Sequence, residues 1–183
     1  MGKLKTYIAL FRGINVGGKN SLKMASLKEV LKSSLFSEAQ TYIQSGNLVF
    51  KAVKTDCNAL SFQLENLVKD HFNIEVSILV ITKKELKEII NKNPFPIKMG
   101  HGTTKLYITF IKAAIRPEII ETFAQSTISE DKFHISKKAI YTLYQIKYSA
   151  SKLNNNFYEK KLNCIATTRN WRTTLKLLEM SKN

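Results

Sequence analysis

The stretch Gln40-Thr-Tyr-Ile-Gln-Ser-Gly-Asn-Leu-Val-Phe-Lys51 decides the fold of the N-terminal half of this chain. Gln40–Gln44 and Asn47–Lys51 flank a Ser45-Gly46 pair, and turn residues placed in this way predict a tight β-hairpin. Upstream, Lys5–Phe11 is rich in aromatic and β-branched residues and predicts a strand. Downstream, Glu75–Ile81 alternates and then runs apolar, which predicts a further strand.

Two amphipathic helices are expected between these strands. Ser26-x-x-Glu29 has the spacing of a capping box, so the first helix should begin near Leu27. Asp56 is the expected N-cap of the second helix. The apolar stripes of the two helices are Leu27, Val30, Leu31 and Leu35, and Leu60, Leu64, Leu67 and Val68. The resulting β-α-β-β-α-β order predicts a ferredoxin-like subdomain over residues 1–81 of an α+β protein.

Residues 82–183 are expected to form a second, smaller α+β subdomain, and we find no internal sequence repeat. Thr82-x-x-Glu85 is a second capping box, and Lys98–Thr104, with its two glycines, is expected to be a mobile connector. The last helix should be capped by Thr167 or Thr168 and should present Trp171, Leu175 and Leu178 on one face. The other elements expected here are strands at Leu106–Ile111, Phe133–Ser136 and Ala139–Ile146, a helix from Pro117, and a helix with irregular ends within Ser149–Leu162.

The composition is that of an ordinary soluble protein, apart from a formal net charge of +15. No apolar run approaches the roughly 20 residues that span a membrane. Two distant cysteines, Cys57 and Cys164, fit a reducing compartment, so we predict a cytoplasmic protein without metal or cofactor. The chain has 25 lysines but only 4 arginines, a bias that A/T-rich codons favour, so we interpret most lysines as solvated surface.

Arg12-Gly-Ile-Asn-Val-Gly-Gly-Lys-Asn20 is one residue short of a phosphate-binding loop, because Asn20 stands where Ser or Thr should hold the metal. In such loops the helix begins at the Gly-Lys pair, whereas here it is expected near Leu27. The predicted strand order also differs from the parallel sheet of those proteins. These three points argue against a nucleoside triphosphatase and leave anion binding without hydrolysis open.

Three polar segments contain no Asp, Glu, His or Cys: Arg12–Asn20, Thr41–Asn47 and Thr167–Arg172. Acid–base or nucleophilic catalysis needs such a group, so the segments favour binding over catalysis, and no catalytic residue is assigned. The spacing of His71, His101 and His134 matches no metal motif. The candidate ligand-binding residues are Arg12, Asn15, Gly17, Gly18, Lys19, Gln44, Asn47, Lys152, Arg169 and Asn170.

With these segments identified, the chain resembles a widespread bacterial family known only as domain of unknown function 1697. The matching motifs are Ala9–Asn20, Thr41–Asn47 with Val49-Phe50, Phe157–Leu162, Ala166–Trp171 and Leu175–Leu178. Where the family has a Gly-Arg-Ser-Lys-Leu-like run, this chain has Tyr148-Ser-Ala-Ser-Lys-Leu153, which lacks the arginine and leaves Lys152 as the cation. The resemblance implies two α+β subdomains, the first ferredoxin-like, and no known activity.

The leading hypothesis is a binding protein for an anionic, phosphate- or carboxylate-bearing ligand. Its site would be formed by the glycine-rich loop and the Thr167–Trp171 segment, with Arg12, Lys19 and Arg169 supplying charge. One alternative is a protein that binds single-stranded nucleic acid, although Tyr42 and Phe50 serve equally well as core or as a stacking platform. Another is an enzyme that acts on a nucleotide-like substrate. The sequence predicts no membrane partner and does not predict the oligomeric state.

Overall fold

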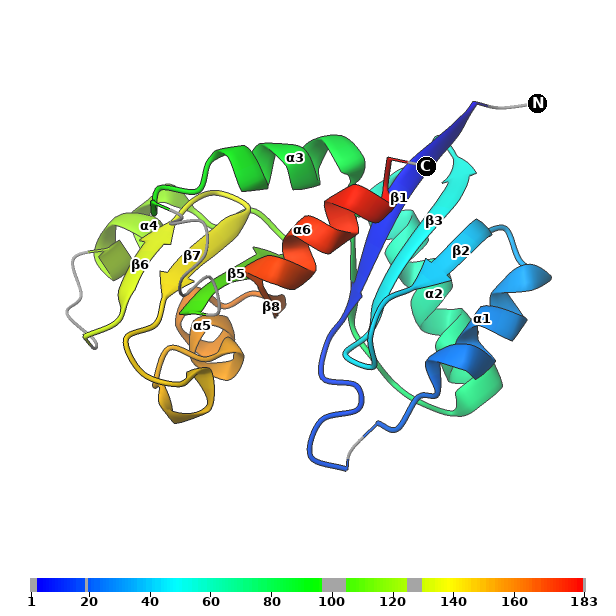
Figure 1. Ribbon diagram of the computed structural model, residues 1–183, viewed down its shortest axis with the longest axis horizontal. Coiled ribbons are helices and arrows are strands. Elements are labelled where there is room, and N and C mark those ends of the chain that lie inside the picture. The colour runs from blue at the N-terminus through cyan, green and yellow to red at the C-terminus, as the bar shows by residue number, and fades with distance from the viewer. Residues whose placement is uncertain (1–2, 19, 97–104, 125–129, 183) are drawn as a thin grey trace. The chain divides into compact units, whose positions relative to one another are not determined.

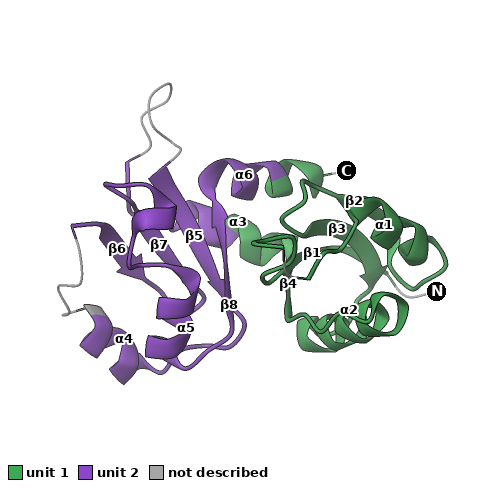
Figure 2. Ribbon diagram, turned by 90° about the horizontal axis from the view of Figure 1, so that it is seen from below, with its two compact units in different colours: residues 1–87, 177–183 green, residues 88–176 purple. Residues whose placement is uncertain are grey.

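The computed structural model describes residues 3–18, 20–96, 105–124 and 130–182 of the chain (Figure 1). Contacts divide the chain into two compact units (Figure 2): unit 1 comprises residues 1–87 and 177–183, and unit 2 comprises residues 88–176. The sequence placed the boundary between residues 81 and 82, whereas the contacts place it within helix α3 (Lys83–Asn91). The chain is α+β, as predicted, with one four-stranded antiparallel sheet in each unit.

Unit 1 contains β1 (Leu4–Phe11), α1 (Met24–Lys32), β2 (Ser37–Thr41), β3 (Asn47–Val53), α2 (Cys57–Phe72) and β4 (Ile78–Thr82). The strands lie in the order β2-β3-β1-β4, and every neighbouring pair is antiparallel. The predicted order of elements is confirmed, and β2 and β3 form the expected hairpin, but residues 42–46 form its loop in place of a tight Ser45-Gly46 turn. The ferredoxin-like assignment itself stays a prediction, which this order supports.

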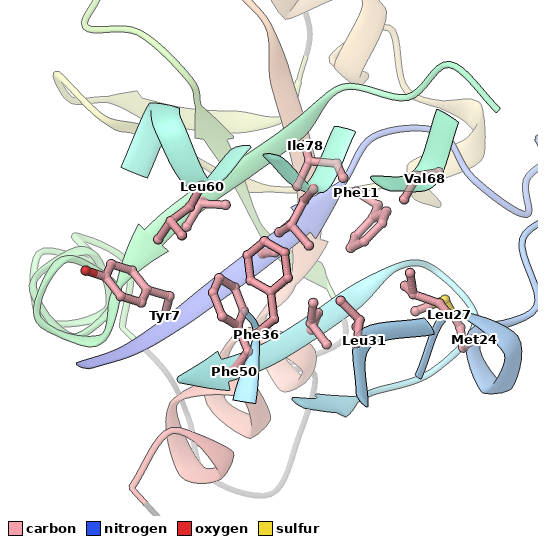
Figure 3. Close-up of a cluster of buried hydrophobic side chains, with 14 of the residues drawn as sticks. Tyr7, Phe11, Met24, Leu27, Leu31, Phe36, Phe50, Leu60, Val68 and Ile78 are labelled. Atoms are coloured by element: carbon pink, nitrogen blue, oxygen red, sulfur yellow. The ribbon is translucent and has the colours of Figure 1, made fainter. Parts of the chain in front are cut away.

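The core of unit 1 lies between the sheet and helices α1 and α2 (Figure 3). Tyr7 and Phe11 of β1 face this core together with Phe50 of β3. Ile8 and Leu10, on the opposite face of β1, are also fully buried. Because a strand segment buried on both faces has no polar residues alternating with its apolar ones, Tyr7–Phe11 of β1 is a continuous apolar run in the sequence.

Two of the three predicted helix starts in unit 1 are confirmed. The Asp56 carboxylate accepts hydrogen bonds from the backbone N–H groups of Asn58 and Ala59, at 2.8 and 3.1 Å. The Thr82 box is complete, since the Thr82 N–H donates to Glu85 Oε2 at 2.9 Å and the Glu85 N–H donates to Thr82 Oγ1 at 3.1 Å.

The capping box predicted at Ser26 is wrong, because helix α1 begins at Met24 and Ser26 lies within it. Glu29 instead pairs with Lys32 at 2.8 Å. Leu35, expected on the apolar stripe, lies beyond the helix and is 76% exposed. Burial of Met24 in the core accounts for the early start, because a buried apolar side chain outweighs the contribution of a surface cap.

Unit 2 contains the second part of α3, followed by six further elements up to the last strand. These are β5 (Leu106–Ile111), α4 (Pro117–Ala124), β6 (Lys132–Ile135), β7 (Ala139–Leu143), α5 (Asn155–Leu162) and β8 (Ala166–Asn170), with the short 3-10 helix η2 (Tyr148–Ala150) before α5. Helix α6 (Trp171–Met180) follows β8 and ends in unit 1. The strands lie in the order β6-β7-β5-β8, with antiparallel neighbours. The predicted connector at Lys98–Thr104 lies outside the described residues.

The last predicted cap is also wrong. Thr167 and Thr168 belong to β8, which pairs with β5, and Asn170 caps the helix by accepting a hydrogen bond from the Thr173 N–H at 2.7 Å. The face that α6 buries also differs from the prediction, since Leu175 is 43% exposed and Leu177 is fully buried. Pairing with a strand some 60 residues earlier in the chain is a tertiary effect that a local pattern does not report.

The two units have the same topology, which no sequence repeat had indicated. Each has the order β-α-β-β-α-β, and in each sheet the first strand lies between the third and the fourth. Even single hydrogen bonds recur: Phe11 N–H donates to Gly46 O in unit 1, and Ile111 N–H donates to Lys138 O in unit 2. Unit 1 and unit 2 therefore share one topology. A connection that is longer in one unit than in the other is longer than the topology requires.

Candidate functional site

Two connections are much longer than the shared fold requires. In unit 1, residues 12–23 join the first strand to the first helix, whereas in unit 2 the five residues 112–116 make the same connection. In unit 2, residues 144–154 join the third strand to the second helix, whereas in unit 1 the three residues 54–56 suffice. We name these the β1–α1 loop and the β7–α5 segment. Long connections that the fold does not need are where binding residues concentrate.

The β1–α1 loop is anchored at both ends. Ile14 and Leu22 are each 1% exposed and belong to the core of unit 1. The Asn15 side chain closes the loop, since its Nδ2 donates to Leu22 O at 2.8 Å and its Oδ1 accepts from Leu22 N–H at 2.8 Å. Asn15 has a φ of 55°, a left-handed conformation that asparagine tolerates better than most residues. The structure thus uses the Asn15 amide to shape the loop.

Between these anchors Val16, Gly17, Gly18 and Asn20 are exposed. Gly17 and Gly18 have φ values of 59° and 74°, and a Cβ built on either would meet nothing within 4 Å. Lys19 lies outside the described residues. Helix α1 begins at Met24, well past the glycine pair, so the geometry is not that of a phosphate-binding loop at a helix N-terminus.

The hairpin loop, residues 42–46, lies beside the β1–α1 loop. Asn15 Nδ2 joins the two by donating to Gln44 O at 2.7 Å, and Gly46 packs against Phe11 and Ile14. Ile43 has a φ of 50° although its exposed side chain is β-branched, which marks a strained backbone. The structure therefore brings together two of the three polar segments that the sequence singled out.

Their side chains serve different purposes. Asn47 is fully buried, and its Nδ2 donates to Tyr42 O at 3.0 Å and to Ser45 Oγ at 3.1 Å, so it holds the hairpin loop. Gln44 is exposed. Arg12 is half-buried, and its backbone N–H donates to Ser77 O at 2.9 Å. Of the predicted residues described in unit 1, Arg12, Gly17, Gly18 and Gln44 are accessible to a ligand.

The third polar segment lies in unit 2. Arg169 is 7% exposed, and its Nη1 donates to Thr167 Oγ1 at 2.9 Å and to Thr168 O at 2.8 Å. Burial lowers the pKa of Arg169 to about 10, so the guanidinium is charged at neutral pH. Arg169 pairs with Ile108 and Asn170 with Tyr107, which places these two predicted residues on opposite faces of the sheet.

The β7–α5 segment forms one side of a recess of about 450 Å³. The other side is formed by Lys105 and Tyr107, at the start of β5. The rings of Tyr107 and Tyr148 stack, with centroids 4.9 Å apart and planes 11° apart, and Tyr144 meets both rings edge-on. The residues that line the recess are Lys105, Tyr107, Tyr144, Ile146, Lys147, Tyr148 and Ser149.

Asp131 holds the β7–α5 segment in place. This carboxylate is buried, and it accepts hydrogen bonds from Gln145 N–H at 2.7 Å and from Ser151 Oγ at 2.6 Å. These two donors flank residues 146–149, which line the recess. Lys152, the predicted cation in this segment, follows the second donor and is exposed.

The sequence did not predict the recess. It left Tyr42 and Phe50 open as core residues or as a stacking platform, and Phe50 is fully buried in the core of unit 1. Tyr107 and Tyr148 are 41 positions apart, so no local pattern links them. The length of the connection after Leu143 was not visible either, because the sequence extended this strand to Ile146 and placed the next helix within Ser149–Leu162, whereas the strand ends at Leu143 and the helix begins at Asn155.

Other chemistry is sparse in the described part of the chain. No cluster of His, Cys, Asp or Glu there could hold a metal ion, and none of the helices described is long and apolar enough to cross a membrane. His71 and His134 are exposed, and His101 lies outside the described residues. Burial raises the pKa of Cys164 to about 11, which makes its thiol a poor nucleophile at neutral pH.

Comparisons with known proteins identify a family and a similar fold. A family model described as "Protein of unknown function (DUF1697)" matches residues 4–141. The solved structure of conserved bacterial protein SP0830 from Streptococcus pneumoniae is similar, with a TM-score of 0.74 and 22% sequence identity over 98% of this chain and 99% of that chain. This likeness shows the fold alone, and no curated protein matches the chain. The chain belongs to the DUF1697 family of proteins of unknown function, the family that its motifs resemble.

Proposed function

We propose that the chain is a binding protein for an anionic ligand, and that the exposed part of the β1–α1 loop contacts the ligand's phosphate or carboxylate group. One observation carries the proposal: unit 2 makes the same connection with five residues, so the extra length in unit 1 serves something other than the fold. The proposal keeps the cytoplasmic location expected from the sequence.

The chemistry of the loop supports an anion rather than a cation. Neither the β1–α1 loop nor the adjoining hairpin loop contains an acidic residue, whereas Arg12 and Lys19 supply positive charge. Gly17 and Gly18 adopt left-handed conformations with open space around them, so a ligand can approach the backbone N–H groups closely. Asn15 and the two buried anchors hold the loop before any ligand arrives, which lowers the entropic cost of binding.

The proposal is tested by a matched pair of variants at one exposed position. Gly18→Asp and Gly18→Asn introduce side chains of nearly equal size that both tolerate a left-handed backbone, and they differ by one negative charge. Binding of inorganic phosphate, pyrophosphate and citrate is measured by calorimetry at low ionic strength. We expect Gly18→Asp to bind the preferred anion about tenfold more weakly than Gly18→Asn, because a like charge a few ångströms away costs at least about 1 kcal/mol.

Equal affinities of the two variants would overturn the proposal, and so would a wild-type protein that binds none of the three anions. The sequence hypothesis also assigned Thr167–Trp171 to the site, so Arg169→Lys is measured in parallel. Unchanged anion binding by this variant would limit the site to unit 1.

A further inference from the structure

We infer that the recess beside the β7–α5 segment is a second binding site, which takes a nucleoside phosphate. The nucleobase lies against the Tyr107–Tyr148 pair, and the phosphate lies near Lys105 and Lys147. The inference stands on unit 2 alone, and it goes beyond the anion site proposed for unit 1. Its first support is again the comparison of the units, since unit 1 closes the same fold with three residues where unit 2 uses residues 144–154.

The rings of the recess suit a flat aromatic ligand. Tyr107 and Tyr148 are both half-buried, so part of each ring remains accessible while the stacked pair fixes their common orientation. Tyr144 supports both rings from the side, and its hydroxyl donates to Leu153 O. A base that extends such a stack gains affinity whatever its hydrogen-bonding pattern, because every base has a π-face. The recess volume of about 450 Å³ is within the range of small-molecule sites.

The cations of the recess suit a phosphate. Lys105 is held at the rim, with its Nζ donating to Gln145 O at 2.8 Å. Lys147 is exposed, and no partner for its ammonium is present in the described part of the chain. The buried Asp131 carboxylate is the opposing charge nearby, but two donors already satisfy it and the two lysines outnumber it.

The site is built before the ligand arrives. Asp131 fastens both ends of residues 145–151, and the Ser151 hydroxyl accepts a further hydrogen bond from Leu153 N–H at 3.0 Å. Tyrosine side chains held in this way lose little conformational freedom on binding. Rigid aromatic rings next to exposed ammonium groups distinguish this recess from a patch of scattered surface lysines.

The test compares probes that carry one part of the ligand at a time. Adenosine 5′-monophosphate, ribose 5-phosphate and adenosine are titrated against the full chain. We expect the nucleotide to bind about tenfold more tightly than ribose 5-phosphate, because stacking contributes only when the base is present. Tyr148→Leu should abolish this difference, whereas the control Tyr148→Phe, which keeps the ring, should preserve it. Lys147→Gln should weaken binding of the nucleotide but leave adenosine unchanged.

Equal affinity for the nucleotide and ribose 5-phosphate would overturn the inference. A folded Tyr148→Leu variant that binds like the wild type would overturn it as well, and Tyr148→Phe shows whether the position tolerates substitution. Loss of nucleotide binding in Gly18→Asp would assign the nucleotide to unit 1, which would overturn this inference and leave the proposed anion site standing. Conversely, if the wild-type protein binds none of phosphate, pyrophosphate and citrate, the anion site of unit 1 is overturned, whereas the nucleotide titrations still decide the recess.

A final arm distinguishes the two sources of a nucleoside phosphate. An eight-nucleotide single strand and the corresponding duplex are titrated at about 200 mM salt, where affinity that depends only on phosphate contacts is strongly reduced. Tighter binding of the single strand than of the mononucleotide identifies a strand as the ligand. The reverse order identifies a free nucleotide. In either case loss of this binding in Tyr148→Leu supports the recess as the site, and its retention overturns the inference.

Discussion

Replacement of Gly46 by alanine should destabilise unit 1 more than the same replacement at Gly17. Both glycines have left-handed backbones, with φ values of 76° and 59°. They differ in their surroundings, because Gly46 is buried against Phe11 and Ile14 whereas Gly17 is exposed. The pair therefore separates the cost of backbone strain from the cost of crowding.

The structure gives the size of each contribution. A Cβ on Gly46 would lie 2.5 Å from Phe11 Cβ and 2.6 Å from Ile14 Cδ1, whereas a Cβ on Gly17 would meet nothing within 4 Å. Left-handed strain costs alanine about 1–2 kcal/mol at either position. Crowding a packed core costs about 1–3 kcal/mol more, and the restriction of the unfolded chain by alanine is common to both variants and cancels. We therefore expect Gly46→Ala to lose about 1–3 kcal/mol more of the free energy of unfolding than Gly17→Ala.

Urea unfolding followed by far-UV circular dichroism measures both losses. Fluorescence is less suitable because the single tryptophan, Trp171, belongs to unit 2 whereas both glycines belong to unit 1. If Gly46→Ala were no less stable than Gly17→Ala, the close packing of Gly46 against Phe11 and Ile14 would be refuted. The join between the β1–α1 loop and the hairpin loop would then need another explanation.

Three further predictions concern single interactions. Asn15→Gly keeps the left-handed backbone but removes the side chain that closes the β1–α1 loop, so urea unfolding should show a loss of about 1–3 kcal/mol; an unchanged midpoint would mean that the loop holds its shape without the amide. Glu85→Ala breaks the capping box of α3 and should cost about 1 kcal/mol, whereas Glu85→Gln, which can still accept from the Thr82 N–H, should recover most of that loss. Burial raises the pKa of Tyr141 from 10.0 to about 12, so its stabilising contribution is complete below pH 10 and is lost as the pH rises towards 12. The wild-type protein should therefore lose more stability than Tyr141→Phe over that interval, and parallel urea midpoints for the two proteins would contradict the assignment.

Local signals were sufficient for much of the fold. The strand expected at Leu106–Ile111 has those bounds in the structure, and the caps at Asp56 and Thr82 form as predicted. Each of these features depends on residues within a few positions of one another, where backbone hydrogen bonding and alternation are decided. The same reasoning failed at Ser26 and Thr168, because burial of Met24 and pairing with β5 outweigh the local preference.

The candidate sites, too, combine features visible in the sequence with features that depend on tertiary contacts. The sequence by itself determined the polar, acid-free segments and the glycines of the β1–α1 loop, since these are properties of composition and spacing. Only the tertiary structure decided that Asn15 and Asn47 serve the loops themselves, because their hydrogen-bond partners are set by how the chain turns back on itself. It also decided that Tyr107 stacks on Tyr148, 41 positions later in the chain. The two rings meet because β5 pairs with β7 and the β7–α5 segment directly follows β7. The duplicated topology is likewise invisible in the sequence, because many different side chains can satisfy the same arrangement of strands and helices.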